Sequence, residues 1–287
     1  MPFLFIQFNV PLEVRDRETE LVETHVTLPK WLDDYIFNKL GAKYCRSNSD
    51  MTVIDWDKSD MLNYLGTYFP RSYAEACCIM GDYLESGNCL IRGKETISIF
   101  DFGCGTGGEI VGIVTQLKKH NERLKEVHVH ALDGNHDALR LCESVLNTFS
   151  QKSGIDIKES PIAYTIEDFY DMSVLDKVLQ NEYDVIMSFK AICEFVTKER
   201  FEKDNAYGHI VKTLLPKLKQ EGIMLLVDVT SYSDVTKEWL PKMMDAGIKT
   251  NLCKIVHKNE GYNQPLYITH SHKSNDVSKV AWRILTH

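Results

Sequence analysis

A glycine-rich stretch with the sequence FDFGCGTGGEI occupies positions 100–110. It follows an apolar segment that is typical of a buried strand and precedes a segment with helical periodicity. Glycine lets the backbone turn sharply and approach a ligand closely. The N-terminus of the following helix offers free N–H groups and the positive end of its dipole. A pyrophosphate or an amino-acid carboxylate would fit such a turn, so the stretch predicts a cofactor site.

The glycines fit two spacing patterns at once. Gly103, Gly105 and Gly108 match the G-x-G-x-x-G turn of dinucleotide sites. The alternative pattern, D-x-G-x-G-x-G, is formed by Asp101, Gly103, Gly105 and Gly107. An acid two positions before the first glycine can receive the ammonium group of an amino acid, whereas a pyrophosphate gains nothing from it. Asp101 therefore favours the second pattern.

Two more acids follow later apolar segments. Asp133 lies near the end of VHVHALDG, where it can accept both hydroxyls of a ribose, which either kind of cofactor carries. Asp168 lies near the end of IAYTIEDF, where it can accept from an adenine amino group while Phe169 packs near the ring. A dinucleotide fold usually begins with its glycine turn, but here a long segment precedes it. These features favour an amino-acid-containing adenosine cofactor over a dinucleotide.

Strand-like and helix-like segments alternate from residue 96 onward. The strand-like segments lie at 96–103, 127–134, 162–169, 183–190 and 222–230. This alternation predicts β-α-β units and an α/β fold, a Rossmann-like doubly wound sheet that is mostly parallel. The segments after residue 250 lack helices between them, which predicts antiparallel strands at the C-terminal edge.

The residues before 96 do not show this alternation of strands and helices. FLFIQFNV and ETHVTL indicate a hairpin, and residues 29–41 indicate a helix. Two further helices are expected on either side of Pro70. We therefore expect an accessory or lid segment of hairpin and helices at 1–75 and a Rossmann-like domain at 76–287. The aromatic and basic residues Tyr64, Tyr68, Arg71 and Tyr73 are expected to form the lid, with Arg71 as a carboxylate ligand.

The motif series resembles that of class I S-adenosylmethionine-dependent methyltransferases. It consists of Asp101-Phe-Gly103-Cys-Gly105-Thr-Gly107, then Asp133 and then Asp168. The resemblance implies that the loop holds the methionine part, Asp133 the ribose and Asp168 the adenine. It also implies that SFKAICEF, after the fourth strand, lies beside the sulfonium and the acceptor. The cofactor-binding residues expected on these grounds are Asp101, Gly103, Cys104, Gly105, Thr106, Gly107, Asp133, Gly134, Asp168, Phe169, Ser188, Phe189, Tyr68 and Arg71.

A second, narrower resemblance concerns two stretches. NYLGTYFPRSYAEA and SFKAICEF are similar to segments of the ribosomal small-subunit methyltransferase-like family of bacteria and mitochondria. Mitochondrial members carry a cysteine cluster for iron–sulfur binding near the C-terminal part, where this chain has only Cys253. The cluster is therefore not expected here.

The segment after the fourth strand bears on the acceptor. Methyl transfer is an in-line displacement, for which the protein aligns the acceptor and removes its proton where needed. Glu194 and Asp228 are the candidate catalytic acids; a helix-surface acid and a bonded acid at a strand end are the structural alternatives. The Asn/Asp-Pro-Pro-aromatic run of base-methylating enzymes is missing, and Cys193 lacks a preceding proline. Base and cytosine-ring methylation are therefore not expected.

Histidines and cysteines do not predict a metal site. His128 and His130 fall on one side of a strand, but a zinc site needs three or four ligands. The spacing of Cys253, His257, His270 and His272 is irregular. We expect these side chains to be structural and no metal to be bound.

The composition of the whole chain limits the choice of function. The 287 residues carry a formal net charge of −8, with 44% hydrophobic and 26% charged residues. A globular, acidic chain does not favour nucleic acid as a partner. Its eight cysteines lack a disulfide framework, and no signal peptide or membrane span is evident, so a cytoplasmic protein is expected.

The function expected from the sequence is an S-adenosylmethionine-dependent methyltransferase with a small-molecule or peptide acceptor. An RNA- or ribosome-associated methyltransferase is the main alternative. A nicotinamide-dependent oxidoreductase would reuse the same glycines, and a non-catalytic binding module could keep the cofactor fold. The oligomeric state and the acceptor atom stay open.

Overall fold

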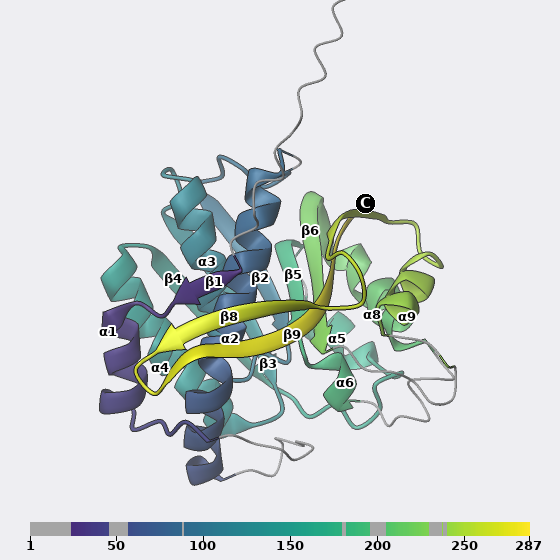
Figure 1. Ribbon diagram of the computed structural model, residues 1–287. Coiled ribbons are helices and arrows are strands. Elements are labelled where there is room, and N and C mark those ends of the chain that lie inside the picture. The colour runs from purple at the N-terminus through teal and green to yellow at the C-terminus, as the bar shows by residue number, and fades with distance from the viewer. Residues whose placement is uncertain are drawn as a thin grey trace, which may run out of the picture.

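The computed structural model in Figure 1 describes residues 24–45, 57–87, 89–179, 182–195, 205–229, 237 and 240–287. Their strands form one mixed sheet of nine strands in the order β1-β8-β9-β6-β5-β2-β3-β4, with β7 paired to β9 beside this path. The strands are β1 (His25–Thr27), β2 (Thr96–Phe102), β3 (Glu126–Asp133), β4 (Asp156–Ala163), β5 (Tyr183–Phe189), β6 (Leu218–Val229), β7 (Lys254–Lys258), β8 (Gln264–His270) and β9 (Lys273–Thr286). The helices are α1 (Lys30–Asp33), the π-helix η1 (Asp34–Lys39), α2 (Lys58–Glu85), α3 (Gly108–His120), α4 (His136–Ser153), α5 (Ser173–Val178), α6 (Ile192–Phe195), α8 (Ala206–Leu214), the 3-10 helix η3 (Leu215–Lys217) and α9 (Leu240–Ile248).

The sheet has the doubly wound, Rossmann-like α/β arrangement that the sequence predicts. Strands β2 to β6 pair in parallel, and β2 lies between β3 and β5. Strand β9 pairs antiparallel with β6 and with β8, which confirms the predicted antiparallel C-terminal edge. The chain builds the sheet from β2 toward β4 and then returns to the other side of β2. The switch point therefore lies at the carboxyl ends of β2 and β5, where ligands bind in open α/β sheets.

Two apolar layers cover the sheet, because alternate side chains of each buried strand point to opposite faces. Ile97 and Ile99 of β2 belong to the core beneath α2, α3 and α4. Phe100 and Phe102 belong to the core beneath α5, α8 and α9. The β8–β9 hairpin crosses over α2 on the first of these faces (Figure 1). Among the described helices, none has the length and apolar character needed to cross a bilayer.

One continuous helix, α2, replaces the two helices expected around Pro70. It begins at a capping box in which the Asp57 carboxylate accepts from the amides of Ser59 and Asp60, at 2.7 and 2.9 Å. Proline inside a helix costs about 3 kcal/mol, but α2 buries most of its residues from Leu65 onward and packs against α3 and β8. Gly112 permits this contact, since a Cβ there would lie 2.6 Å from the Ala76 Cβ. The expected division between residues 75 and 76 falls within this helix.

Two other elements differ from the sequence expectations. The third parallel strand is Asp156–Ala163 and not 162–169, because it pairs in register with the whole of β3. It is an edge strand with exposed polar residues, where Pro161 is tolerated because one side makes no ladder. The strand β1 pairs in parallel with β8. The expected hairpin partner at 3–10 lies outside the described residues.

Candidate functional site

The glycine loop connects β2 to α3 at the switch point of the sheet. Gly103, Gly105 and Gly107 have φ angles of 78°, 49° and 79°, in the left-handed region that favours glycine. The N-cap residue of α3 is Gly107, which has no side chain to bond to the first amides of the helix. The sequence prediction that these glycines form a sharp turn before a helix is confirmed.

The loop is enclosed by α2 on one side and by α4 on the other. A Cβ on Gly105 would lie 3.0 Å from the Tyr64 hydroxyl oxygen, and one on Gly107 would lie 2.7 Å from the Cys142 sulfur. Cys104 and Thr106, between these glycines, are buried. The loop therefore has no room for larger residues at Gly105 and Gly107.

Asp133 fastens the loop to the end of β3. Its Oδ2 accepts from the Gly105 amide and its Oδ1 from the Asn135 amide, both at 2.8 Å. Burial raises the pKa of Asp133, while bonds from the amides of Asn135, Gly105 and Gly134 oppose that effect. Each oxygen keeps a further lone pair that a ribose hydroxyl could use.

Asp101 is a fully buried acid at the end of β2. Neither carboxylate oxygen accepts a hydrogen bond from a donor among the described residues. Burial, Glu109 and Asp133 raise the pKa of Asp101 well above its usual range. Burial also raises the pKa of Glu109, in the first turn of α3, to about 8. These three carboxyls create a pocket of negative potential at the base of the loop.

Lys190 is the first residue after β5, and its cation lies near this acidic group. Its Nζ is 2.8 Å from Oε1 and 2.8 Å from Oε2 of Glu75, a fully buried residue of α2. Lys190 adopts a φ of 57° and donates its amide to the Val227 carbonyl. Lys190 acts to lower the pKa of Glu109, and Glu75 acts to raise it. The single cation of Lys190 therefore interacts with more than one carboxyl group, those of Glu75 and Glu109.

Glu75 and Glu109 were not predicted as site residues. A weak signal existed, because each acid interrupts an apolar run, AEACCIM for Glu75 and GGEIVGIV for Glu109. An acid inside an apolar helical segment is buried only if something compensates it. The compensating groups come from distant segments, which periodicity alone does not identify.

The predicted residues Ser188 and Phe189 are the last two residues of β5, and they point to opposite faces of the sheet. Asp101 is paired with Met187 in the sheet, so the Ser188 side chain points to the opposite face. Its hydroxyl is buried without a hydrogen-bond partner among the described residues. The Phe189 side chain points to the same face of the sheet as Asp101 and is buried in the core beneath α2 and α3.

Asp168 and Phe169 lie in the loop after β4 and not within a strand. The Asp168 carboxylate accepts from the Tyr170 amide at 3.1 Å. The Phe169 ring is buried and meets the Phe102 ring edge-on, with centroids 6.4 Å apart. Contact of these two residues with an adenine ring stays a prediction.

The expected lid is the N-terminal half of α2. The rings of Tyr64 and Tyr68 stack with centroids 4.9 Å apart, and Tyr64 lies against the glycine loop. Arg71 has a partner within the chain, because its Nε and Nη2 bond to the two carboxylate oxygens of Asp276, at 2.8 and 3.0 Å. Its guanidinium therefore fastens α2 to β9. The pairing uses the two parallel N–H donors with which the guanidinium would otherwise bind a cofactor carboxylate.

The candidate catalytic acids give different outcomes. Asp228, near the end of β6, is buried and accepts from the Tyr207 hydroxyl at 2.9 Å and the Val229 amide at 2.8 Å. Burial raises its pKa. This is the arrangement of the structural alternative, a bonded acid at a strand end. Glu194 lies in α6, but its side chain is outside the described part of the chain.

Within the described part of the chain, no group of His, Cys, Asp and Glu side chains could hold a metal ion. His257 bonds to Asp82 at 2.7 Å. His270 and His272 stack on Phe37, with centroids 5.2 and 4.2 Å away. The histidines of the C-terminal strands are engaged separately.

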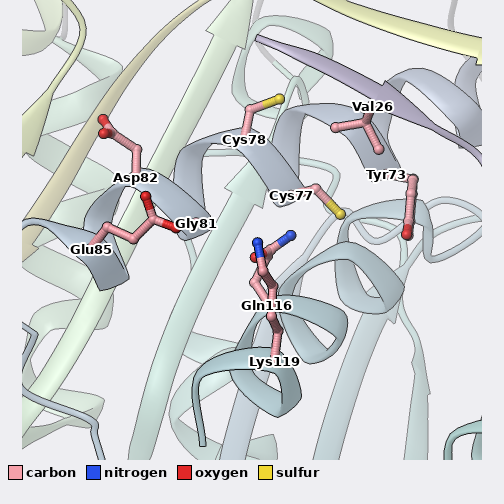
Figure 2. A pocket seen from close by; sticks show the side chains of 9 residues that line it. All are labelled: Val26, Tyr73, Cys77, Cys78, Gly81, Asp82, Glu85, Gln116 and Lys119. Atoms are coloured by element: carbon pink, nitrogen blue, oxygen red, sulfur yellow. The ribbon is translucent and has the colours of Figure 1, made fainter. Parts of the chain in front are cut away.

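A separate hollow of about 140 Å³ lies between α2, α3 and β1 (Figure 2). Figure 2 shows Gln116 and Lys119 extending from α3 toward α2, with Cys77 opposite. Its lining comes from the C-terminal halves of α2 and α3, whereas the glycine loop precedes the N-terminus of α3. The hollow is therefore distinct from the candidate cofactor site.

No protein-family model matches the chain, and no curated protein is significantly similar in sequence. TrmN from Thermus thermophilus is a similar solved structure, with 14% identity, a TM-score of 0.43 and coverage of 77% of this chain and 53% of its own. A Listeria monocytogenes protein assigned to the class I S-adenosylmethionine-dependent methyltransferases has 13% identity, a TM-score of 0.44 and coverage of 83% and 63%. The rRNA methyltransferase AviRa from Streptomyces viridochromogenes has 10% identity, a TM-score of 0.38 and coverage of 73% and 82%. The chain spans less than two thirds of the length of the first two proteins. These similarities are distant.

Proposed function

We propose that the chain is an S-adenosylmethionine-dependent methyltransferase that acts on a small-molecule or peptide acceptor. The observation that carries this proposal is the buried carboxyl of Asp101, which lacks a hydrogen-bond donor among the described residues and lies beside the glycine loop. Burying a carboxyl without a donor is unfavourable unless a proton or a cation accompanies it. The ammonium group of an amino acid would supply both the charge and the donors.

The residues at the switch point fit the parts of this cofactor. Asp101 would accept from the ammonium, and the free amides at the start of α3 would face the carboxylate. Asp133 would accept from the ribose hydroxyls with its remaining lone pairs, and Asp168 from the adenine amino group. A pyrophosphate would meet the carboxyls of Asp101, Glu109 and Asp133 instead, and like charges repel. This disfavours a nicotinamide cofactor.

The bound cofactor supplies a methyl group on a sulfonium, and the neutral thioether that departs with the bonding electrons is a good leaving group. The remaining task of the protein is to align the acceptor and to take its proton where it carries one. Glu194 is the proposed acid for that task, and Asp228, which the Tyr207 hydroxyl and the Val229 amide already engage, is the second candidate. The formal net charge of −8 disfavours a polyanionic acceptor such as RNA. All cysteines are free thiols, which suits the reducing environment of the cytoplasm.

The test is calorimetric titration of the whole chain with S-adenosylmethionine, S-adenosylhomocysteine and NAD. Binding of the first two in the micromolar range, and none of NAD, is the expected result. Binding of NAD alone would overturn the proposal in favour of an oxidoreductase. Transfer of labelled methyl groups should then reach metabolite or peptide fractions of a cell extract. Label in RNA would overturn the acceptor class, and binding without transfer would indicate a non-catalytic module.

A further inference from the structure

We propose that Glu109 is a further cofactor-binding residue, which forms with Asp101 an acid pair that releases a proton when the ammonium group of the cofactor enters. This inference rests on the proposed function and deepens it. It assigns a role to a residue of α3 that neither of the glycine spacing patterns includes.

The pair is defined by its geometry. Asp101 is fully buried at the end of β2, and Glu109 is 4% exposed in the first turn of α3. The two carboxyls lie within hydrogen-bonding reach of each other. Two ionised carboxylates are both acceptors, so a bond between them requires a proton. No amide, amine or hydroxyl of the other described residues bonds to Asp101, so the unliganded pair keeps that proton.

The surroundings of the pair support the same conclusion. Asp133 of β3 and Glu75 of α2 add negative charge, and the thiols of Cys104 and Cys142 are buried nearby. Lys190 is a cation, but both oxygens of Glu75 engage it. Burial raises the pKa of Asp101 and that of Glu109, the latter to about 8. These raised pKa values agree with the proton that the burial of the pair and its missing donors require.

The exchange balances in charge and in bonds. The ammonium brings one positive charge into the site, and the departing proton removes one. The O–H bond of the protonated carboxyl breaks, and its proton passes to solvent. The two carboxylates then accept hydrogen bonds from the three N–H groups of the ammonium, which replace the bond between the acids. Cofactor binding therefore becomes stronger as pH rises through the titration of the pair.

Proton release can be measured on the whole chain without any substitution. Calorimetric titrations with S-adenosylhomocysteine would be run in two buffers of different ionisation enthalpy, slightly below neutral pH, where an α-amino group carries its own proton. Methylthioadenosine is the matched probe, because it keeps the adenosine and the thioether but lacks the ammonium and the carboxylate. The expected result is release of close to one proton with S-adenosylhomocysteine and of almost none with methylthioadenosine.

Substitutions assign the proton to the pair. Glu109→Gln keeps an acceptor oxygen but cannot titrate, so it should bind S-adenosylhomocysteine while releasing less than half as many protons as the unsubstituted chain. Asp101→Asn should weaken binding at least about tenfold, because a charged acceptor is lost. Glu126→Gln is the control, since Glu126 is the first residue of β3 and engages Lys158, far along the strand from Asp133. It should leave the proton count unchanged.

The outcomes separate this inference from the proposed function. If S-adenosylhomocysteine binds without proton release, or if methylthioadenosine releases as many protons, the acid pair is wrong and the cofactor assignment stands. If neither probe binds, both proposals fail. A normal proton count in Glu109→Gln would overturn the role of Glu109. The comparison of the two probes decides the question even if a substituted chain fails to fold.

Discussion

The ammonium nitrogen of Lys190 lies 2.8 Å from each carboxylate oxygen of Glu75, and this ion pair connects the residue after β5 to α2. The Glu75 side chain is fully buried, and that of Lys190 is 13% exposed. The pair therefore joins the segment beside the expected methyl-transfer position to the helix that covers the glycine loop.

Removing one partner of this pair should be costly. Lys190→Met leaves a buried carboxylate without its cation, and the free energy of unfolding should fall by about 3 kcal/mol. Urea denaturation at neutral pH measures this change. The double variant Glu75→Gln/Lys190→Met should regain part of the loss, because no unpaired charge stays buried. Strictly additive losses would contradict the pairing.

Substitutions at Gly107 test whether the glycine loop has room for a side chain at this position. Gly107→Ala places a Cβ 2.7 Å from the Cys142 sulfur at a φ of 79°, so it should lower the free energy of unfolding by about 2–4 kcal/mol. Gly154→Ala is the control, with a φ of 71° and no atom within 4 Å, and should show the backbone cost alone, about 1–2 kcal/mol. Chemical denaturation of both variants separates the two contributions.

Adding Cys142→Ala to Gly107→Ala should remove the steric part of that loss. The double variant should then resemble Gly154→Ala once the separate effect of Cys142→Ala is subtracted. No relief would show that the contact with Cys142 does not limit the loop.

Asp133 should affect both the loop and the affinity for the cofactor. In Asp133→Asn an amide NH₂ replaces one oxygen and faces either the Gly105 or the Asn135 amide, so one backbone bond is lost. We expect affinity for S-adenosylmethionine to fall about 5- to 150-fold, from a loss of about 1–3 kcal/mol. Calorimetry checks this, with Glu126→Gln at the other end of β3 as the control. Equal affinities for the two variants would contradict a role of Asp133 in the site.

The position of the glycine loop in the fold could be predicted from the sequence, whereas the extent of two elements could not. Glycine spacing and the alternation of strands and helices are local signals, and they locate the loop at the switch point. Pro70 is also a local signal, but the burial of α2 against α3 outweighs it. The strand β4 was misplaced because its exposed edge carries polar residues and Pro161, which resemble a connection.

Charged partners were the least predictable part of the site. Arg71 bonds to Asp276, and Lys190 to Glu75, across long stretches of sequence. Nothing in the local pattern distinguishes an arginine that binds a ligand from one that fastens a helix to a strand. Pairing across elements decides which cations stay available to a cofactor.

The bidentate pair of Arg71 and Asp276 predicts a pH-dependent contribution to stability. Burial acts to raise the pKa of Asp276, but the nearby His270, with its Nε2 4.0 Å from Oδ2, and the bidentate Arg71 hold it well below its usual range. A carboxyl whose pKa is lower in the folded state stabilises the fold above its unfolded pKa of about 3.9 and loses that contribution as pH falls toward the folded value. At neutral pH, Asp276→Asn should therefore lower the free energy of unfolding by about 2–3 kcal/mol. The difference between the two chains should shrink steadily below about pH 4.

Urea denaturation at a series of pH values checks this dependence. Glu95→Gln is the control, because Glu95 pairs with Lys125 at an exposed position and should change stability little at any pH. A difference between Asp276→Asn and the unsubstituted chain that stays constant from neutral to acid pH would mean that the loss comes from packing and not from the ionised pair. Persistence of cofactor binding in Asp276→Asn and in Arg71→Lys would further support a fastening role for Arg71, since a direct ligand of the cofactor carboxylate could not be replaced at a bidentate position without loss of affinity.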